Sequence, residues 1–237
     1  MQTIPLTQLL YMFIPLSVVG VAYYLWVGKK SEIALATLRM SVQLLLVGYV
    51  LTSLFSTNSL ALLSLLVVVM VVSASLIVRR NIRHKDWKTY AVILGAISLG
   101  GSLNLAWVLW VVLSLDDPLE PRFVIPLAGM IYANAMNAIS LCAERYEKEK
   151  EHGLTHEKAR AIAFKASMMP QINSFLAVGF VSLPGMMTGQ ILSGIDPLIA
   201  VRYQIVVMAM ILSSGAMSNM LYLSTLNSRF LVKMTQK

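Results

Sequence analysis

The chain has 237 residues, of which 57% are hydrophobic and 13% are charged, and its mean hydropathy is +0.73. A soluble domain carries about 25% charged residues, so this composition excludes one and predicts an integral membrane protein. The net charge of +8 comes mainly from Lys and Arg residues in the connections between apolar segments. Membrane topology explains this distribution, so we expect the chain to contact the lipid bilayer and not to bind nucleic acid.

Seven apolar segments are long enough to cross a bilayer, which takes about 20 residues of helix for a core of about 30 Å. They are residues 5–27, 33–55, 60–78, 90–115, 123–142, 172–192 and 198–223. The one sizeable polar stretch follows the fifth segment and leaves no room for a soluble catalytic domain. The sequence therefore predicts an all-α polytopic protein with about seven transmembrane helices, forming a single membrane domain over residues 1–237.

The basic residues predict the orientation of the chain. Sixteen of the 19 Lys and Arg residues lie in four alternate connections: residues 29–30, 79–88, 145–165 and 229–237. Because cytoplasmic connections of membrane proteins are enriched in Lys and Arg, this pattern places the N-terminus outside and the C-terminus in the cytosol. An odd number of crossings fits that orientation.

The polar segment 143–170 is the one long cytosolic connection. Gly153 is expected to end a helix that extends the fifth span, and Thr155 to cap the helix that follows. Pro170 is expected to stop that second helix before the sixth span. Its small apolar face has helical spacing and consists of Ala159, Ile162, Ala163 and Ala166. The segment is either a solvated connector or an element that docks on a soluble partner.

Polar side chains within the predicted spans are costly in lipid and therefore informative. Arg39 lies about two turns into the second span, with Gln43 one turn further on the same face. Arg39 either extends to the cytosolic surface or forms an inward-facing pair with Gln43. Asn134 and Asn137 lie on one face of the fifth span, where they favour helix contacts or a cavity.

The predicted sixth span contains residues that break helices. Pro184 removes a backbone donor, and nearby glycines lower the cost of leaving helical geometry. Irregular backbone at membrane depth is tolerated where protein or water covers it, so the pattern predicts a break that lines an interface or a passage. The candidate pathway residues are Pro184, Gly185, Met186, Met187, Gly189 and Gln190. The methionines suit packing or a soft metal.

The chain lacks a nucleotide-binding loop and any catalytic pair within its spans, so we expect no enzyme and no cofactor in it. Cys142 is the single cysteine, and His152 and His156 are separated by residues that break helices. No set of metal ligands can be named. Transport by such a chain needs either an ion gradient or a separate ATPase.

Three stretches carry a resemblance to a known family: RMSVQLLLVGYVL at 39–51, GLTHEKA at 153–159 and SLPGMMTGQILSGIDPLIAVRYQI at 182–205. They resemble the FetB-like permeases, membrane subunits of an iron-export ABC transporter related to plant aluminium-tolerance proteins. The resemblance implies a permease of the bacterial inner membrane, paired as a homodimer with a cytosolic ATPase that binds ATP and Mg. It also implies that residues 153–170 form the coupling helix on that ATPase.

The substrate stays open at this point. The resemblance implies export of iron or another metal ion, although a hard cation prefers oxygen ligands and the spans supply few carboxylates. The alternatives are export of a different substrate, such as a nucleotide sugar, and a scaffold or sensor that recruits a cytosolic partner without transport.

Overall fold

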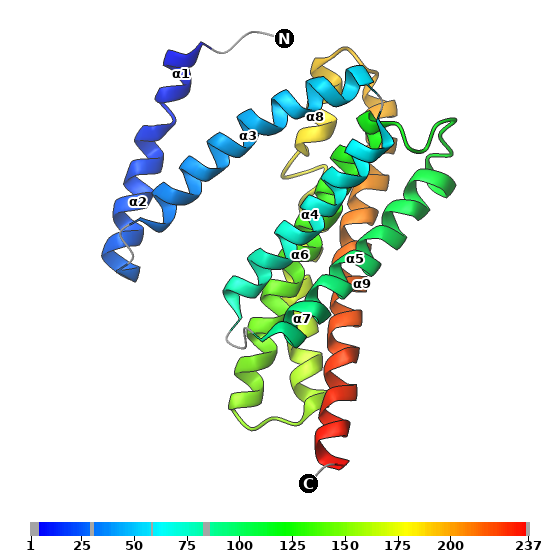
Figure 1. Ribbon diagram of the computed structural model, residues 1–237. Coiled ribbons are helices and arrows are strands. Elements are labelled where there is room, and N and C mark those ends of the chain that lie inside the picture. Colours follow the sequence, from blue (N-terminus) through cyan, green and yellow to red (C-terminus); the bar gives the residue numbers. More distant parts are fainter. Residues whose placement is uncertain (1–4, 29–30, 58, 83–85, 236–237) are drawn as a thin grey trace. The chain divides into compact units, whose positions relative to one another are not determined.

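The structure is a computed structural model, and it describes residues 5–28, 31–57, 59–82 and 86–235. Within these residues every extended regular element is a helix, as the composition predicts (Figure 1). The chain divides into two compact units, residues 1–58 and 59–237. Lys29, Lys30 and residues 83–85, which belong to the predicted basic connections, lie outside the described residues.

The first unit contains α1 (Leu6–Leu10), α2 (Phe13–Val27) and α3 (Glu32–Thr57). Gly28 ends α2 with φ +79°, a conformation that glycine adopts without strain. The Tyr23 hydroxyl donates a hydrogen bond to Glu32 Oε2 over 2.8 Å and links the end of α2 to the start of α3. No residue of α2 is buried, so its apolar side chains present a surface that suits lipid.

The second unit holds the remaining elements: α4 (Leu60–Asn81), α5 (Trp87–Trp107), the π-helical turn η1 (Val108–Val112), α6 (Pro121–Glu151), α7 (His156–Ala177), α8 (Gly185–Leu192) and α9 (Pro197–Thr235). Helix α6 is its centre, because it packs against α4, α5, α7 and α9. Its buried face includes Ile131, Ala135, Ile139 and Cys142. These residues recur at helical spacing and form one packed side of α6.

The helix ends in this unit follow local chemistry. The Ser59 hydroxyl accepts a hydrogen bond from the Leu62 backbone N–H at the start of α4, and the Asp86 carboxylate accepts one from Thr89 at the start of α5. Pro121 begins α6, where its missing donor costs nothing. Gly153, with φ +78°, follows the end of α6, as predicted.

Six helical stretches of the described residues are long and apolar enough to cross a membrane: Thr7–Val27, Glu32–Phe55, Leu60–Asn81, Trp87–Val112, Pro121–Glu151 and Pro197–Leu226. The segment predicted as the sixth of seven spans, residues 172–192, is not one helix. It contains the end of α7, a turn and α8, so the predicted break is confirmed. The number of crossings and the orientation of the termini stay predictions.

The prediction that Pro170 ends a helix is wrong. Helix α7 continues through Pro170 to Ala177. A proline inside a helix costs about 3 kcal/mol, because it removes one backbone hydrogen bond. The packing of α7 against α6 and α9 supplies contacts that local propensity does not register. Residues 156–170 therefore belong to one helix that runs on to Ala177.

Candidate functional site

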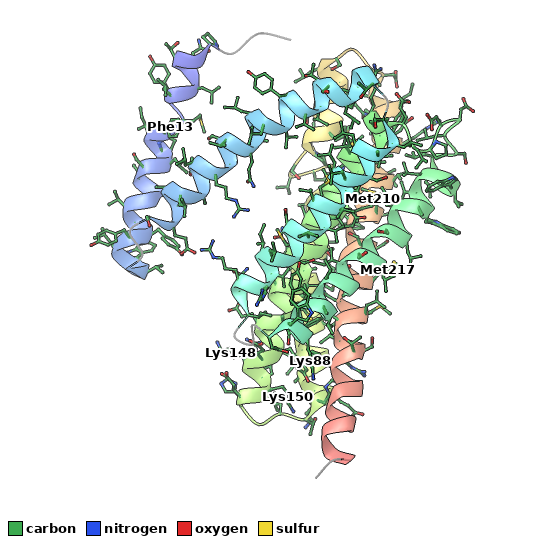
Figure 2. All side chains as sticks on the ribbon, viewed as in Figure 1. Phe13, Lys88, Lys148, Lys150, Met210 and Met217 are labelled. Atoms are coloured by element: carbon green, nitrogen blue, oxygen red, sulfur yellow. The ribbon has the colours of Figure 1, made fainter. Side chains whose placement is uncertain are left out.

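Helices α6 and α7 form a hairpin around the turn at Gly153 (the α6–α7 hairpin). A hydrogen bond of 2.8 Å joins the Tyr146 hydroxyl to His156 Nδ1, and the two rings meet edge to face. Lys150 Nζ donates to the Leu154 carbonyl over 3.1 Å; Figure 2 shows Lys148 and Lys150 on this end of α6. These contacts hold together the turn that joins the two helices.

The pKa of His156 is lowered mainly by burial of its ring, and further by the positive charges of Arg160 and Lys150; Glu157 acts weakly in the opposite direction. The imidazole is therefore favoured in its neutral form. That form leaves Nδ1 available for the bond to the Tyr146 hydroxyl. His156 consequently serves as a polar link within the hairpin.

A polar cavity of about 550 Å³ lies between α6, α7 and α9, near the end of α4. Six amide and serine side chains from α6 and α7 line it: Asn134, Asn137, Ser140, Ser167, Gln171 and Ser174. Asn81 and Glu144 line the cavity at the end nearer the α6–α7 hairpin. A volume of this size suits a small-molecule ligand, and the lining offers many hydrogen-bonding groups.

Gln171 is the most deeply placed amide of the polar cavity, with 8% of its surface exposed. Its Oε1 is buried and accepts no hydrogen bond among the described residues. A Cβ atom at Gly215 of α9 would lie 2.6 Å from its Nε2, so glycine at 215 makes room for this amide. An unsatisfied buried acceptor is costly, which marks Gln171 as a group available to a ligand.

The turn between α7 and α8 leaves few backbone groups unpaired. Gly179 adopts φ +94°, and its N–H donates to the Ser182 carbonyl over 3.0 Å. The Val181 N–H donates to the Ala177 carbonyl over 2.9 Å. These internal hydrogen bonds allow a non-helical segment in an apolar environment.

An apolar pocket of about 310 Å³ adjoins this turn, between α7, α8 and α9. Its lining includes Leu183, Met187, Val201 and Ile205, and one polar side chain, Gln204. Gln204 is 4% exposed, and its Oε1 has no hydrogen-bond partner among the described residues. The break in the helix therefore forms the wall of an apolar pocket.

Comparison with known proteins places this arrangement in a family. The profile of the uncharacterised protein family UPF0014 matches residues 6–155 and 152–231, which is nearly the whole chain. The chain belongs to UPF0014. Its six candidate spans agree with the description of its relatives as membrane proteins, and the UPF0014 protein is a multi-pass membrane protein.

Three relatives show the breadth of the family. The probable iron export permease protein FetB of Escherichia coli is 34% identical over 87% of this chain and 86% of its own. The UPF0014 membrane protein YjkA of Bacillus subtilis is 33% identical over 81% of each chain. The protein ALUMINUM SENSITIVE 3 of Arabidopsis thaliana is 29% identical over 80% of this chain and 74% of its own. No solved structure shows a significant match.

The predicted coupling residues of this UPF0014 protein fall into two groups. Gly153 and Thr155 are exposed at the turn, and Thr155 caps α7, although its side chain makes no capping hydrogen bond. Ile162 and Ala166 are half-buried. Ala159 and Ala163 are 0% exposed, because α7 packs this face against its neighbouring helices. The expectation that these two alanines form an outward docking face is therefore wrong.

The exposed side of α7 in the hairpin is the one that sequence reasoning overlooked. It carries Glu157, Lys158, Arg160, Ala161 and Lys165. The spacing of the alanines identifies one face correctly, but it does not say whether that face meets its own chain or a partner. The charged residues between the alanines were the sequence signal that could have identified this exposed side.

The intramembrane polar residues separate between the two units. Asn134 and Asn137 both line the polar cavity, and Asn134 Nδ2 donates to the Met130 carbonyl over 2.8 Å. Arg39 and Gln43 are exposed on α3 of the first unit. The structure thus brings the two asparagines to one site, together with Gln171, which sequence reasoning did not select.

The candidate pathway residues lie at the N-cap of α8 and along the helix. Pro184 precedes the helix, and the others belong to it: Gly185, Met186, Met187, Gly189 and Gln190. The non-helical segment lies before Pro184, so the residue that holds it is Gly179 with its positive φ. Only Met187 of the group lines the apolar pocket. The Gln190 side chain has a buried Oε1 with no partner in the described part of the chain.

Metal ligands do not gather in the described residues: no group of three or more His, Cys, Asp and Glu side chains there is placed to hold a metal ion. His152 is exposed, and His156 has Nδ1 engaged by Tyr146. Cys142 is buried in the core of the second unit. The polar cavity instead offers neutral amide and hydroxyl groups and the single carboxylate of Glu144.

Proposed function

We propose that this protein is the permease subunit of an ABC exporter in the bacterial inner membrane, driven by a separate cytosolic ATPase that binds ATP and Mg. The observation that carries the proposal is the continuity between the hairpin and the cavity. Helices α6 and α7 both line the polar cavity, and both run without interruption into the α6–α7 hairpin. A displacement of the hairpin would therefore move two walls of the cavity.

The name of a relative supports the same function. FetB, which matches most of this chain, is named a probable iron export permease. A permease that depends on an ATPase needs a cytosolic contact surface, and the exposed hairpin residues around Gly153 and Arg160 provide one. ABC permease subunits act in pairs, so the proposed assembly is a homodimer with two ATPase subunits.

Iron or another metal ion is the first substrate to test, because of the name of FetB. The lining of the polar cavity favours a second candidate. Amide and hydroxyl groups with one carboxylate suit an uncharged polar solute better than a bare hard cation, which prefers several carboxylates, and better than a nucleotide sugar, whose phosphates would meet no basic side chain among the described lining residues. Both candidates need the same coupling to ATP hydrolysis.

The transport experiment uses inverted vesicles that contain the protein and its cognate ATPase. We expect ATP-dependent accumulation of radiolabelled iron or of a competing solute, lost when the ATPase cannot hydrolyse ATP. Accumulation without the ATPase would exclude an ABC permease. Formation of the complex without flux of any solute would favour the scaffold or sensor.

The coupling experiment reverses charge on the exposed side of α7. Arg160→Glu and Lys158→Glu should weaken co-purification with the ATPase and reduce stimulation of its ATP hydrolysis. The matched control is Arg202→Glu, an exposed position at the other end of the second unit, which should leave both unchanged. An intact complex with both α7 variants would refute docking through the hairpin.

A further inference from the structure

The polar cavity and the apolar pocket are neighbours, because Phe175 of α7 and Met208 of α9 line both of them. Together they form one groove along α7 and α9, with a polar part and an apolar part. Such a division is unusual for a site that takes a purely polar solute. We propose that this groove binds an amphiphile whose hydrogen-bond-donating head lies in the polar part and whose tail lies in the apolar part.

The polar part sets the chemistry of the head. Its only charged lining residue in the described chain is Glu144, so an anionic head such as a phosphate would meet repulsion and no basic partner. Gln171 Oε1 is buried and lacks a donor. An uncharged head with hydroxyl or N–H groups, or an ammonium head, supplies that donor and is compatible with the carboxylate.

The apolar part sets the chemistry of the tail. Leu183, Met187, Val201 and Ile205 offer aliphatic contact. Gln204 is the exception, and its buried Oε1 also lacks a donor. It lies one helical turn before Met208, the wall shared by both parts. A hydroxyl or amide N–H at the junction of head and tail would satisfy Gln204 while the rest of the tail stays apolar.

The order of the two parts agrees with an amphiphile of the inner leaflet. Along α7 the polar lining residues, from Ser167 to Ser174, come before the apolar ones. Glu144 lies toward the α6–α7 hairpin, which the basic connections predict to be cytosolic. The polar part would then lie near the headgroups of the inner leaflet and the apolar part deeper in the hydrocarbon. Phe175, Leu183 and Ile205 are exposed on this unit, which leaves a lateral route from the bilayer.

The test measures binding to the full-length protein in lipid nanodiscs, with no ATPase and no nucleotide, so its outcome is separate from that of the proposed transport function. The probe is a dodecylammonium ion with a photoreactive diazirine near the end of its tail. Mass spectrometry of the labelled protein should find the label on α8 and the α9 residues of the apolar pocket. Label spread evenly over lipid-facing helices would overturn the proposal.

Competition defines the head. Unlabelled dodecylammonium should displace the probe at least about tenfold more effectively than dodecyltrimethylammonium, which has the same charge but no donor and so cannot make a charge-assisted hydrogen bond to the amide oxygen. Dodecyl phosphate should compete least, because of Glu144. Equal competition by all three would refute a donor-specific head site and would indicate a tail-binding pocket only.

Variants connect the binding to the two amides. Gln171→Leu and Gln204→Leu remove unsatisfied acceptors, so they should fold normally and reduce labelling by about tenfold each. The matched control is Phe180→Ala, which removes a side chain that is 98% exposed and does not line the groove, and it should label like the unmodified protein. Unchanged labelling in both leucine variants would exclude the proposed contacts, and the competition series decides the matter if either variant fails to fold.

Discussion

Helix α9 contacts α5 and α7 through glycine and amide residues in both cases, but only the contact with α7 borders a cavity. On one side Gly100 of α5 lies against Ser218, and Asn104 Nδ2 donates to the Met210 carbonyl over 2.8 Å; Figure 2 marks Met210 on α9. On the other side Gly215 of α9 lies against Gln171 of α7. The first contact borders neither the polar cavity nor the apolar pocket, although Ser218 Oγ there also has no hydrogen-bond partner among the described residues. The second borders a cavity, and its amide oxygen is unsatisfied.

The comparison shows that small and amide residues in a membrane helix do not by themselves distinguish packing from a ligand site. At Gly100 an added Cβ would meet backbone atoms of Ser218, so that contact is set by close approach of two helices. At Gly215 an added Cβ would meet only the end of the Gln171 side chain. What separates the two contacts is whether the groups that face each glycine can move into open space.

The largest effect is expected in the hairpin half of α7, where the helix packs against its own chain. Ala163→Glu places a charge where the side chain is 0% exposed, and we expect a loss of at least about 3 kcal/mol in the free energy of unfolding, measured by SDS titration in mixed micelles. The matched control is Ala161→Glu on the exposed side of the same helix, which should change it by less than about 0.5 kcal/mol. Equal stability of the two variants would mean that α7 does not pack here as described.

The next largest effect compares the two glycine contacts directly. Gly100→Ala should cost about 2–3 kcal/mol, because the backbone of Ser218 would have to move. Gly215→Ala should cost less than about 1.5 kcal/mol, because the Gln171 amide can turn toward the polar cavity. Gly129→Ala, with open space around it, is the control. A reversed order in thermal unfolding would contradict this distinction between the two glycine contacts.

The sequence allows most of the local structure to be predicted. The turn at Gly153, the cap at Thr155 and the break before Pro184 follow from residue chemistry within a few positions. The path of α7 through Pro170 does not, because it depends on contacts with α6 and α9 that are distant in sequence.

The site is harder to predict for the same reason. Asn134 and Asn137 stand out as amides in an apolar span, and both line the cavity. Gln171 and Gln204 are equally visible as residue types. Their importance comes from lacking partners, which depends on pairings across the fold, such as Gln171 with Gly215. An unsatisfied acceptor is a property of the packed chain and has no local signature.

A smaller effect is expected in the turn between α7 and α8, which borders the apolar pocket. Gly179→Ala should cost about 1–2 kcal/mol, because φ +94° is strained for any residue with a Cβ, although nothing lies within 4 Å. Gly185→Ala, in open space with an ordinary φ, is the matched control and should be nearly neutral. Hydrogen exchange of residues 177–184 should rise only in the first variant. Equal exchange in both would show that Gly179 does not hold the turn.

The smallest effect concerns the protonation of His156 in the α6–α7 hairpin. Burial lowers the pKa of His156 below its ordinary value of 6.5, so below that pH the unfolded chain binds more protons than the folded chain. The stability contributed by this residue is therefore present above about pH 6.5 and is lost as the pH falls through the folded pKa. Protection factors of residues 152–158, which correct for the intrinsic pH dependence of amide exchange, should fall on acidification, and His156→Gln should remove that fall. The groove at the other end of α7 should not respond to the same change, since no histidine lines it in the described chain. A parallel response at both ends would mean that the hairpin and the groove lose stability together, so that the two ends of α7 would not differ in this respect.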